Sequence, residues 1–202
     1  MSLLAKIKER FNRSSVTLEL DDIQALILRS RPEPYVGIHI MLRIEDAAGG
    51  RELLGRLTPH ITSAHDWTED LDYWIGVGIS YQGLKSLGVP EEVLKTFPLP
   101  FQQGMAARAP QLRDQGPNAP ENWEEAFQPG NCHLAITIYA QDKEGLDKAL
   151  ARAKTELERS AGITLIGSHE FGAPEGVKNP FGFRDNISNP AIEGSGIDPL
   201  PG

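Results

Sequence analysis

Hydrophobic residues alternate with other residues over residues 36–44, which predicts a β-strand with one apolar face. The apolar positions are Val36, Ile38, Ile40, Leu42 and Ile44. The same alternation recurs over residues 73–79 and 134–138, and it predicts two further strands there. A short apolar run at residues 163–166 predicts a fourth strand.

Between these strands the apolar residues follow helical spacing. One helix is predicted to begin near Ala47 and to kink or end near Pro59, because proline lacks the amide hydrogen that a helix needs. A longer helix is predicted after Asp142, a favourable N-cap, and Gly162 stands where a C′ glycine would end it. A short helix is predicted around Leu84.

Residues 89–130 have a different composition. They contain seven prolines and three glycines, a density that excludes a long regular element. The segment is therefore expected to be a structured insertion or a long functional loop. Trp123 and Phe127 are expected to attach it to the core.

The order strand, helix, strand, insertion, strand, helix, strand predicts an α+β fold of the ferredoxin-like, or split βαβ, type. This fold has an antiparallel sheet with both helices on one face. The domain is expected to occupy residues 21–172, after an N-terminal tail at residues 1–20. Residues 173–202 lack periodicity and are expected to form a loop region outside the sheet.

The composition and charge of the chain exclude several classes of protein and of partner. A chain of 202 residues with 40% hydrophobic and 24% charged residues is expected to form one globular domain. The net charge of −8 argues against nucleic acid or an anionic membrane as a partner. The single cysteine, Cys132, excludes a disulfide within the chain and a four-cysteine metal site. Without a membrane span or a signal-peptide core in the sequence, a cytoplasmic location is expected.

Several well-known metal-binding and nucleotide-binding motifs are absent from this sequence. No two histidines have the i, i+4 spacing of a metal-binding helix, so no metal site built by this chain is expected. Neither a Walker A loop nor a complete dinucleotide fingerprint is present. The histidines are His39, His60, His65, His133 and His169.

One stretch near the C-terminus carries a sequence pattern that is informative about function. Gly182-Phe183-Arg184-Asp185-Asn186 resembles the Gly-x-x-Asp-Gly motif of dye-decolorizing (DyP-type) haem peroxidases, and the resemblance continues through Ile-Ser and Pro-Ala-Ile-Glu-Gly to Gly194. Residues 22–28 resemble the opening strand of that family, and residues 103–108 resemble part of its long insertion. The family's fold is a pair of ferredoxin-like halves. The resemblance thus implies that this chain is one half of a dimeric α+β barrel arrangement.

The resemblance also implies a chemistry. Asp185 matches the family's distal acid–base, a carboxylate that moves a proton between the two oxygens of hydrogen peroxide. The resemblance implies that the neighbours of Asp185 shape the pocket of haem b. It also implies an organic electron donor as the second substrate. The expected assembly is a homo-oligomer. These neighbours are Phe183, Arg184, Asn186, Ile187 and Ser188. Without the flanking match, Asp185 would be interpreted as an ordinary turn residue.

Two departures from the family pattern define the alternatives. Asn186 stands where the motif ends in glycine, and asparagine is among the residues that best tolerate a positive φ there. The family's proximal histidine and distal arginine lie downstream of the motif, whereas this chain ends 17 residues after Asp185. The first hypothesis is therefore the N-terminal half of a peroxidase, with its iron ligand outside this chain. The alternative is a non-catalytic ferredoxin-like domain for binding or dimerisation, a truncated or decayed relative.

Overall fold

A computed structural model describes residues 17–29, 34–67, 70–173, 181–183 and 192–196. The chain divides into two compact units. The smaller unit combines the N-terminal residues to Ser30, Ser63–Trp67 and the residues from Pro174 onward. The larger unit, Arg31–Thr62 with Thr68–Ala173, contains the sheet.

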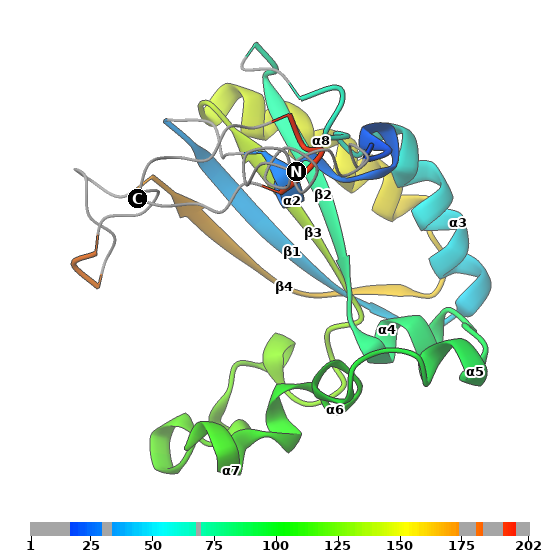
Figure 1. The fold of residues 1–202 in the computed structure, drawn as a ribbon, viewed down its shortest axis with the longest axis vertical. Coiled ribbons are helices and arrows are strands. Elements are labelled where there is room, and N and C mark those ends of the chain that lie inside the picture. The colour runs from blue at the N-terminus through cyan, green and yellow to red at the C-terminus, as the bar shows by residue number, and fades with distance from the viewer. Residues whose placement is uncertain (1–16, 30–33, 68–69, 174–180, 184–191, 197–202) are drawn as a thin grey trace, which may run out of the picture. The chain divides into compact units, whose positions relative to one another are not determined.

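The larger unit is built on a four-stranded antiparallel sheet (Figure 1). Its strands are β1 (Val36–Ile44), β2 (Tyr73–Ile79), β3 (Leu134–Ala140) and β4 (Ile163–Gly172). Their order across the sheet is β2-β3-β1-β4, in which β1 and β3 are central. This order confirms the predicted ferredoxin-like fold.

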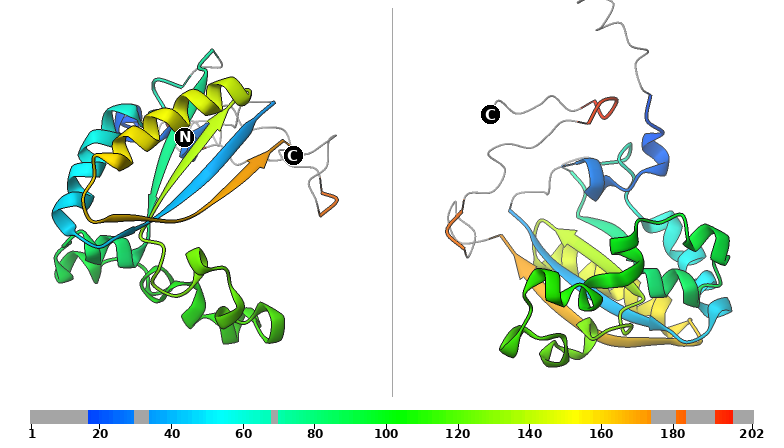
Figure 2. Two further views of the ribbon diagram at one scale, coloured as in Figure 1. Left: turned by 180° about the vertical axis from the view of Figure 1, so that it is seen from behind. Right: turned by 60° about the horizontal axis from the view of Figure 1, so that its bottom comes forward.

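Both long helices, α3 (Ala47–Leu57) and α8 (Lys143–Glu158), cover the same face of the sheet (Figures 1 and 2). Each begins at an aspartate whose carboxylate accepts a backbone N–H: Asp46 from Gly49 at 2.7 Å and Asp142 from Gly145 at 2.9 Å. The predicted N-cap Asp142 is thereby confirmed. The predicted end of α3 is confirmed as well, since Pro59 lies in the following 3₁₀ turn η2 (Thr58–His60).

The hydrophobic core lies between the sheet and these two helices. The apolar residues predicted by the alternation of β1 and β3 are buried there, and Leu42, Ile136 and Ile138 are fully buried. Leu53 and Ala149 contribute from the helices and are also fully buried. Burial of this apolar surface is the main term that favours folding.

Residues between β2 and β3 contain only short helices, as predicted. These are α4 (Tyr81–Ser86), α5 (Glu91–Leu94), α6 (Leu99–Ala107), α7 (Ala109–Leu112), η3 (Gly116–Asn118), η4 (Pro120–Asn122) and η5 (Glu125–Phe127). They lie at the end of the sheet where β2 ends and β3 begins (Figures 1 and 2).

The residue of this insertion that is buried against the sheet is Ala126 rather than the predicted Phe127. Phe127 is 51% exposed, whereas its neighbour Ala126 is 4% exposed and packs beside Gly167 of β4. A small side chain fits here because η5 comes close to the strand at a position without a side chain. Phe127 is therefore not buried in the core, although its ring contacts that of His169 in β4, with the centroids 5.6 Å apart.

The predicted end of the fourth strand and the predicted cap of the second long helix also need correction. The fourth strand runs from Ile163 to Gly172 rather than ending at Ile166, because a register shift opposite Met41 and Leu42 lets pairing with β1 continue. Gly162 has a φ of +67°, but α8 ends four residues earlier, at Glu158, so the glycine forms the turn into β4 rather than the helix cap.

The smaller unit lacks the opening strand expected at residues 22–28. The 3₁₀ turn η1 (Leu20–Asp22) is followed by an isolated bridge between Gln24 and Ser63 and by one helical turn, α2 (Ala25–Leu28). A four-residue apolar run cannot distinguish a strand from a buried helical turn, and here the local i→i+4 bond from Arg29 to Ala25 forms instead. Within the described residues, no helix combines the length and apolarity needed to cross a membrane.

Candidate functional site

Most residues of the predicted haem-contacting loop lie outside the described residues. These are Arg184, Asp185, Asn186, Ile187 and Ser188. Phe183 is described and is 71% exposed, and the nearby Phe181 is 85% exposed. Two large aromatic side chains therefore stand at the surface immediately before Asp185.

Within the smaller unit, Arg29 connects segments that are far apart in the sequence. Its Nε donates to the backbone oxygen of Ala64 at 3.0 Å, and its guanidinium also donates to the backbone oxygen of Ser195 at 3.2 Å. Ser195 is 1% exposed. The segment that follows the predicted loop is thus tied to the N-terminal part of the chain by a charge-assisted pair of bonds.

The sheet face opposite α3 and α8 carries two histidines and several aromatic side chains. We call it the open face because these two helices do not cover it, although Met41 and Trp74 on it are buried. Because side chains alternate along a strand, it is formed by the partners of the core positions. Its residues are Gly37, His39, Met41, Trp74, Gly76, Gly78, Ala135, Thr137, Tyr139, Gly167, His169 and Phe171.

Two histidines lie directly opposite each other on the open face, His39 on β1 and His169 on β4. His39 Nδ1 is 3.0 Å from the hydroxyl of Thr137, and His169 Nε2 is 2.8 Å from the carboxylate of Glu124. The sequence interpretation placed His169 after the fourth strand, but it lies within β4. The extra length of that strand is what brings it beside His39.

Aromatic rings surround this polar cluster. The ring of Phe171 lies 4.5 Å from that of His39 and 4.9 Å from that of Tyr139, measured between centroids. A side chain at Gly37 would collide with Phe171, so the glycine provides the space for this ring. Phe127 stacks on His169 at 5.6 Å. Aromatic rings thus pack against both histidines of the cluster.

This environment lowers the pKa of His39 below its ordinary value of 6.5. Burial is the main cause, since it disfavours the charged ring, and repulsion from His169 adds to it. The neutral form is thus favoured in the folded protein, in agreement with its contact to the Thr137 hydroxyl.

The lowered pKa predicts a pH dependence of stability. As the pH falls through 6.5, His39 takes up a proton more readily in the unfolded chain than in the folded one, so the free energy of unfolding decreases. In the variant His39→Gln this part of the decrease is absent. Urea unfolding between pH 7.5 and 5 should therefore show a shallower loss of stability for the variant, and identical slopes would contradict the assignment.

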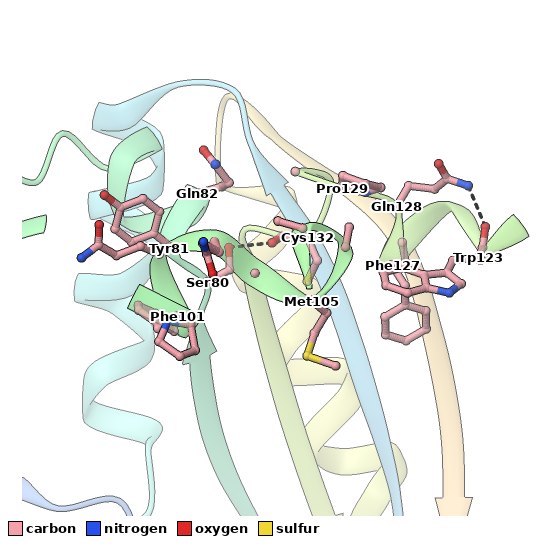
Figure 3. A pocket seen from close by; sticks show the side chains of 18 residues that line it. Ser80, Tyr81, Gln82, Phe101, Met105, Trp123, Phe127, Gln128, Pro129 and Cys132 are labelled. Carbon is pink, nitrogen blue, oxygen red and sulfur yellow. Dashed lines mark hydrogen bonds between the residues drawn. The ribbon is translucent and has the colours of Figure 1, made fainter. Parts of the chain in front are cut away.

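A pocket of about 630 Å³ opens in the insertion; we call it the insertion pocket (Figure 3). Eighteen residues line it, from the end of β2, from α4 and α6, and from the segment around η5. In this view Met105 lies between Phe101 on one side and Phe127 on the other. Ser80 donates a hydrogen bond to the backbone oxygen of Cys132 at 2.7 Å, which closes one wall. Burial raises the pKa of the Cys132 thiol, so the thiolate is disfavoured.

The histidines do not combine into a metal site in the described part of the chain. His133 is buried, and its ring nitrogens bond to the backbone of Ile44 and of Gly130. His60 contacts the guanidinium of Arg152, and His65 lies 3.6 Å from a carboxylate oxygen of Asp21. No group of three metal-binding side chains occurs among the described residues.

The sequence predicted neither the contact between Glu124 and His169 nor the insertion pocket. Glu124 gave no signal, because its partner His169 is 45 residues away in the sequence. The insertion pocket had an indirect signal, since the block at residues 103–108 that resembles the peroxidase family supplies much of its α6 wall.

Comparison with known proteins gives consistent results. Residues 22–166 match the family described as the DyP dimeric alpha+beta barrel domain. The chain is 29% identical over 194 residues to a dye-decolorizing peroxidase of Mycena epipterygia, covering 92% of this chain and 35% of that protein. It is 30% identical over 191 residues to the dye-decolorizing peroxidase msp1 of Mycetinis scorodonius, covering 90% of this chain and again 35% of the relative.

Solved structures show the same likeness. The chain superimposes on an ancestral D-type dye-decolorizing peroxidase with a TM-score of 0.76 at 26% identity, covering 89% of this chain and 41% of that one. It superimposes on the DyP-type peroxidase of Auricularia auricula-judae with a TM-score of 0.74 at 24% identity, covering 93% and 41%, and this second match speaks for the fold alone. The chain thus spans about a third of the length of the curated relatives.

Proposed function

Because the chain belongs to the DyP-type peroxidase family through its DyP dimeric alpha+beta barrel domain, we propose that it forms the N-terminal part of a haem peroxidase. This enzyme would use hydrogen peroxide to oxidise an organic electron donor. The proposal is carried by the family match over residues 22–166, together with the motif-like sequence from Gly182 to Asp185. It includes the cytoplasmic location and the homo-oligomer expected from the sequence.

In this proposal Asp185 is the acid–base of the peroxide step. Its carboxylate accepts the proton of one peroxide oxygen and returns that proton to the other oxygen, which then leaves as water. Near its ordinary pKa of about 3.9 a carboxylate exchanges protons readily, which favours activity in acid. Haem b would supply the iron centre that reduces the peroxide and oxidises the donor.

The neighbours of Asp185 would contact the haem. Phe183 and Phe181, both largely exposed, would pack against a flat apolar ring. Arg184, Asn186, Ile187 and Ser188 would shape the loop around it; they are assigned on the resemblance alone. These residues would bind and orient the group, whereas the proton transfer is left to Asp185.

The iron ligand is proposed to come from outside this chain. Each of the five histidines is already in contact with a hydrogen-bonding or charged group of the chain, as described above. Use of one of them as a ligand would first break such a contact. His133 is the least available, because it is 9% exposed and bonded at both ring nitrogens.

A hemin titration tests the proposal. The purified chain is expected to give no histidine-ligated Soret spectrum, whereas the protein extended to the full length of its relatives should give one together with peroxide-driven oxidation of a dye. A histidine-ligated spectrum of the short chain would contradict the external ligand. Absence of bound hemin from the extended protein would contradict the peroxidase proposal as a whole.

A second candidate function is a non-catalytic domain for binding or dimerisation. It is favoured by the open face, where the aromatic side chains of Tyr139 and Phe171 line a sheet surface that α3 and α8 do not cover. A chain that sediments as a dimer, combined with an extended protein that takes up no hemin, would make this candidate the better one.

A further inference from the structure

The side chain of Met105 brings a sulfur atom to the wall of the insertion pocket (Figure 3). We propose that Met105 is a modification site, at which hydrogen peroxide oxidises the thioether to the sulfoxide and thereby makes this apolar wall polar. The reaction takes place directly between the side chain and the peroxide. It requires neither haem nor Asp185, so it can occur or fail independently of the proposed peroxidase function.

Exposure distinguishes Met105 from the other methionine in the described part of the chain. Met105 is 59% exposed on α6, whereas Met41 is 3% exposed in β1. An oxidant must reach the sulfur atom before it can react, so the exposed thioether is the susceptible one. Met41 has the same chemistry in the same chain and differs in its burial, which makes it an internal control.

Cys132 lines the same pocket and is the competing target for peroxide. A cysteine reacts with peroxide through its thiolate. Burial raises the pKa of the Cys132 thiol, so the reactive form is scarce. A thioether has no proton to lose, and its reaction does not depend on an ionisation. Oxidation in the pocket is therefore expected at Met105 before Cys132.

The reaction transfers one oxygen atom to the side chain. A lone pair of the Met105 sulfur attacks one oxygen of hydrogen peroxide, and the O–O bond breaks. The sulfur is oxidised by two electrons and keeps that oxygen as the sulfoxide. The second oxygen is reduced and leaves as water after it takes up the proton of the first. Methionine sulfoxide reductases reverse this modification.

Oxidation changes the character of the pocket wall. None of the eighteen lining residues is Asp, Glu, Lys, Arg or His. Phe101 and Phe127, between which Met105 lies in Figure 3, are 37% and 51% exposed. Three large apolar side chains around one hollow form an apolar patch. The sulfoxide oxygen is a hydrogen-bond acceptor that is costly to cover with apolar groups, so it would interrupt this patch.

The test is a time course of the purified chain in hydrogen peroxide at pH 7, followed by peptide mapping with mass spectrometry. We expect Met105 to be oxidised at least about tenfold faster than Met41, in line with their exposed fractions of 59% and 3%. Cys132 should still be a thiol when half of Met105 has reacted. In the urea-unfolded chain, where burial no longer protects Met41, the two methionines should react at similar rates.

Retention on a hydrophobic interaction column measures the change in the pocket wall. The oxidised chain should elute earlier than the untreated chain, and reduction by methionine sulfoxide reductases should restore the original retention. Met105→Leu is the matched control, because leucine keeps an apolar side chain of similar size but has no sulfur. The same peroxide treatment should leave the retention of this variant unchanged.

Three results would overturn the proposal. They are equal oxidation rates of Met105 and Met41 in the folded chain, oxidation of Cys132 ahead of Met105, and a peroxide-induced shift in retention that is as large in Met105→Leu as in the unchanged chain. None of these measurements uses haem or a peroxidase assay. A negative result here therefore leaves the proposed peroxidase function untouched, and failure of the hemin titration leaves the Met105 site untouched.

Discussion

Replacing Asp185 by asparagine is expected to slow the reaction of the haem-loaded, full-length enzyme with hydrogen peroxide by about 10²–10⁴-fold, the usual contribution of a positioned general acid–base. Asparagine keeps the size and the polarity of the side chain but cannot take up the peroxide proton. The rate is measured by stopped-flow absorbance as a function of peroxide concentration. The Soret band of the resting enzyme measures haem occupancy in the same samples.

The matched control is Asp147→Asn. Asp147 lies exposed on α8, where it forms an ion pair with Lys143, and its variant should react with peroxide at the rate of the unchanged enzyme. The pH profile adds a second criterion. The rate of the unchanged enzyme should stay high in mild acid and fall only below about pH 4, the ordinary range in which a carboxylate is protonated, and this fall should be absent in Asp185→Asn. An Asp185→Asn enzyme that binds haem and reacts at the normal rate would remove this residue from the mechanism.

The second large effect concerns stability. Ile136→Ala is expected to lower the free energy of unfolding by about 2–5 kcal/mol, the range for truncation of a buried aliphatic side chain. Ile136 is fully buried in β3, the central strand between β1 and β2, and it packs in the core below α3 and α8. The decrease in the free energy of unfolding has two causes: the smaller side chain gains less free energy on transfer from water, and its truncation leaves a cavity. Urea unfolding followed by circular dichroism measures it.

Leu165→Ala is the control for this variant. Leu165 is 60% exposed on the edge strand β4, so its truncation should change the free energy of unfolding by no more than about 0.5 kcal/mol. If Ile136→Ala and Leu165→Ala had equal free energies of unfolding, the core would not lie between the sheet and the helices as described. A changed slope of the free energy of unfolding against urea concentration would instead indicate a change in the compactness of the unfolded or native state, or unfolding that is not two-state.

Local patterns were sufficient to predict much of the fold. The period-two alternation of β1 and the helical spacing of α8 predicted which residues face the core, because one buried face imposes its period on the sequence. Asp46 and Asp142 both cap their helices through bonds to residues three positions away, and Asp142 was predicted for this reason. Pro59 ends α3 for an equally local reason.

Predictions failed where the local signal was short or ambiguous. Ala25–Leu28 is apolar in either structure, so its four residues could not reveal a helical turn instead of a strand. Phe127 was expected to attach the insertion to the core, but the space beside Gly167 admits only the small side chain of Ala126. The fit between two surfaces far apart in the sequence, and not residue hydrophobicity, decided which of the two is buried.

The sequence alone therefore determined the four strands, the two long helices, their order and the resemblance of the residues around Asp185 to a peroxidase motif. Each of these depends on residues within a few positions of one another. Only the tertiary structure decided that His39 faces His169, that Glu124 reaches that pair, and that Tyr81, Met105 and Phe127 surround one pocket. Those contacts depend on the register of β1 against β4 and on the path of the insertion, which are set by packing between distant parts of the chain rather than by any local period.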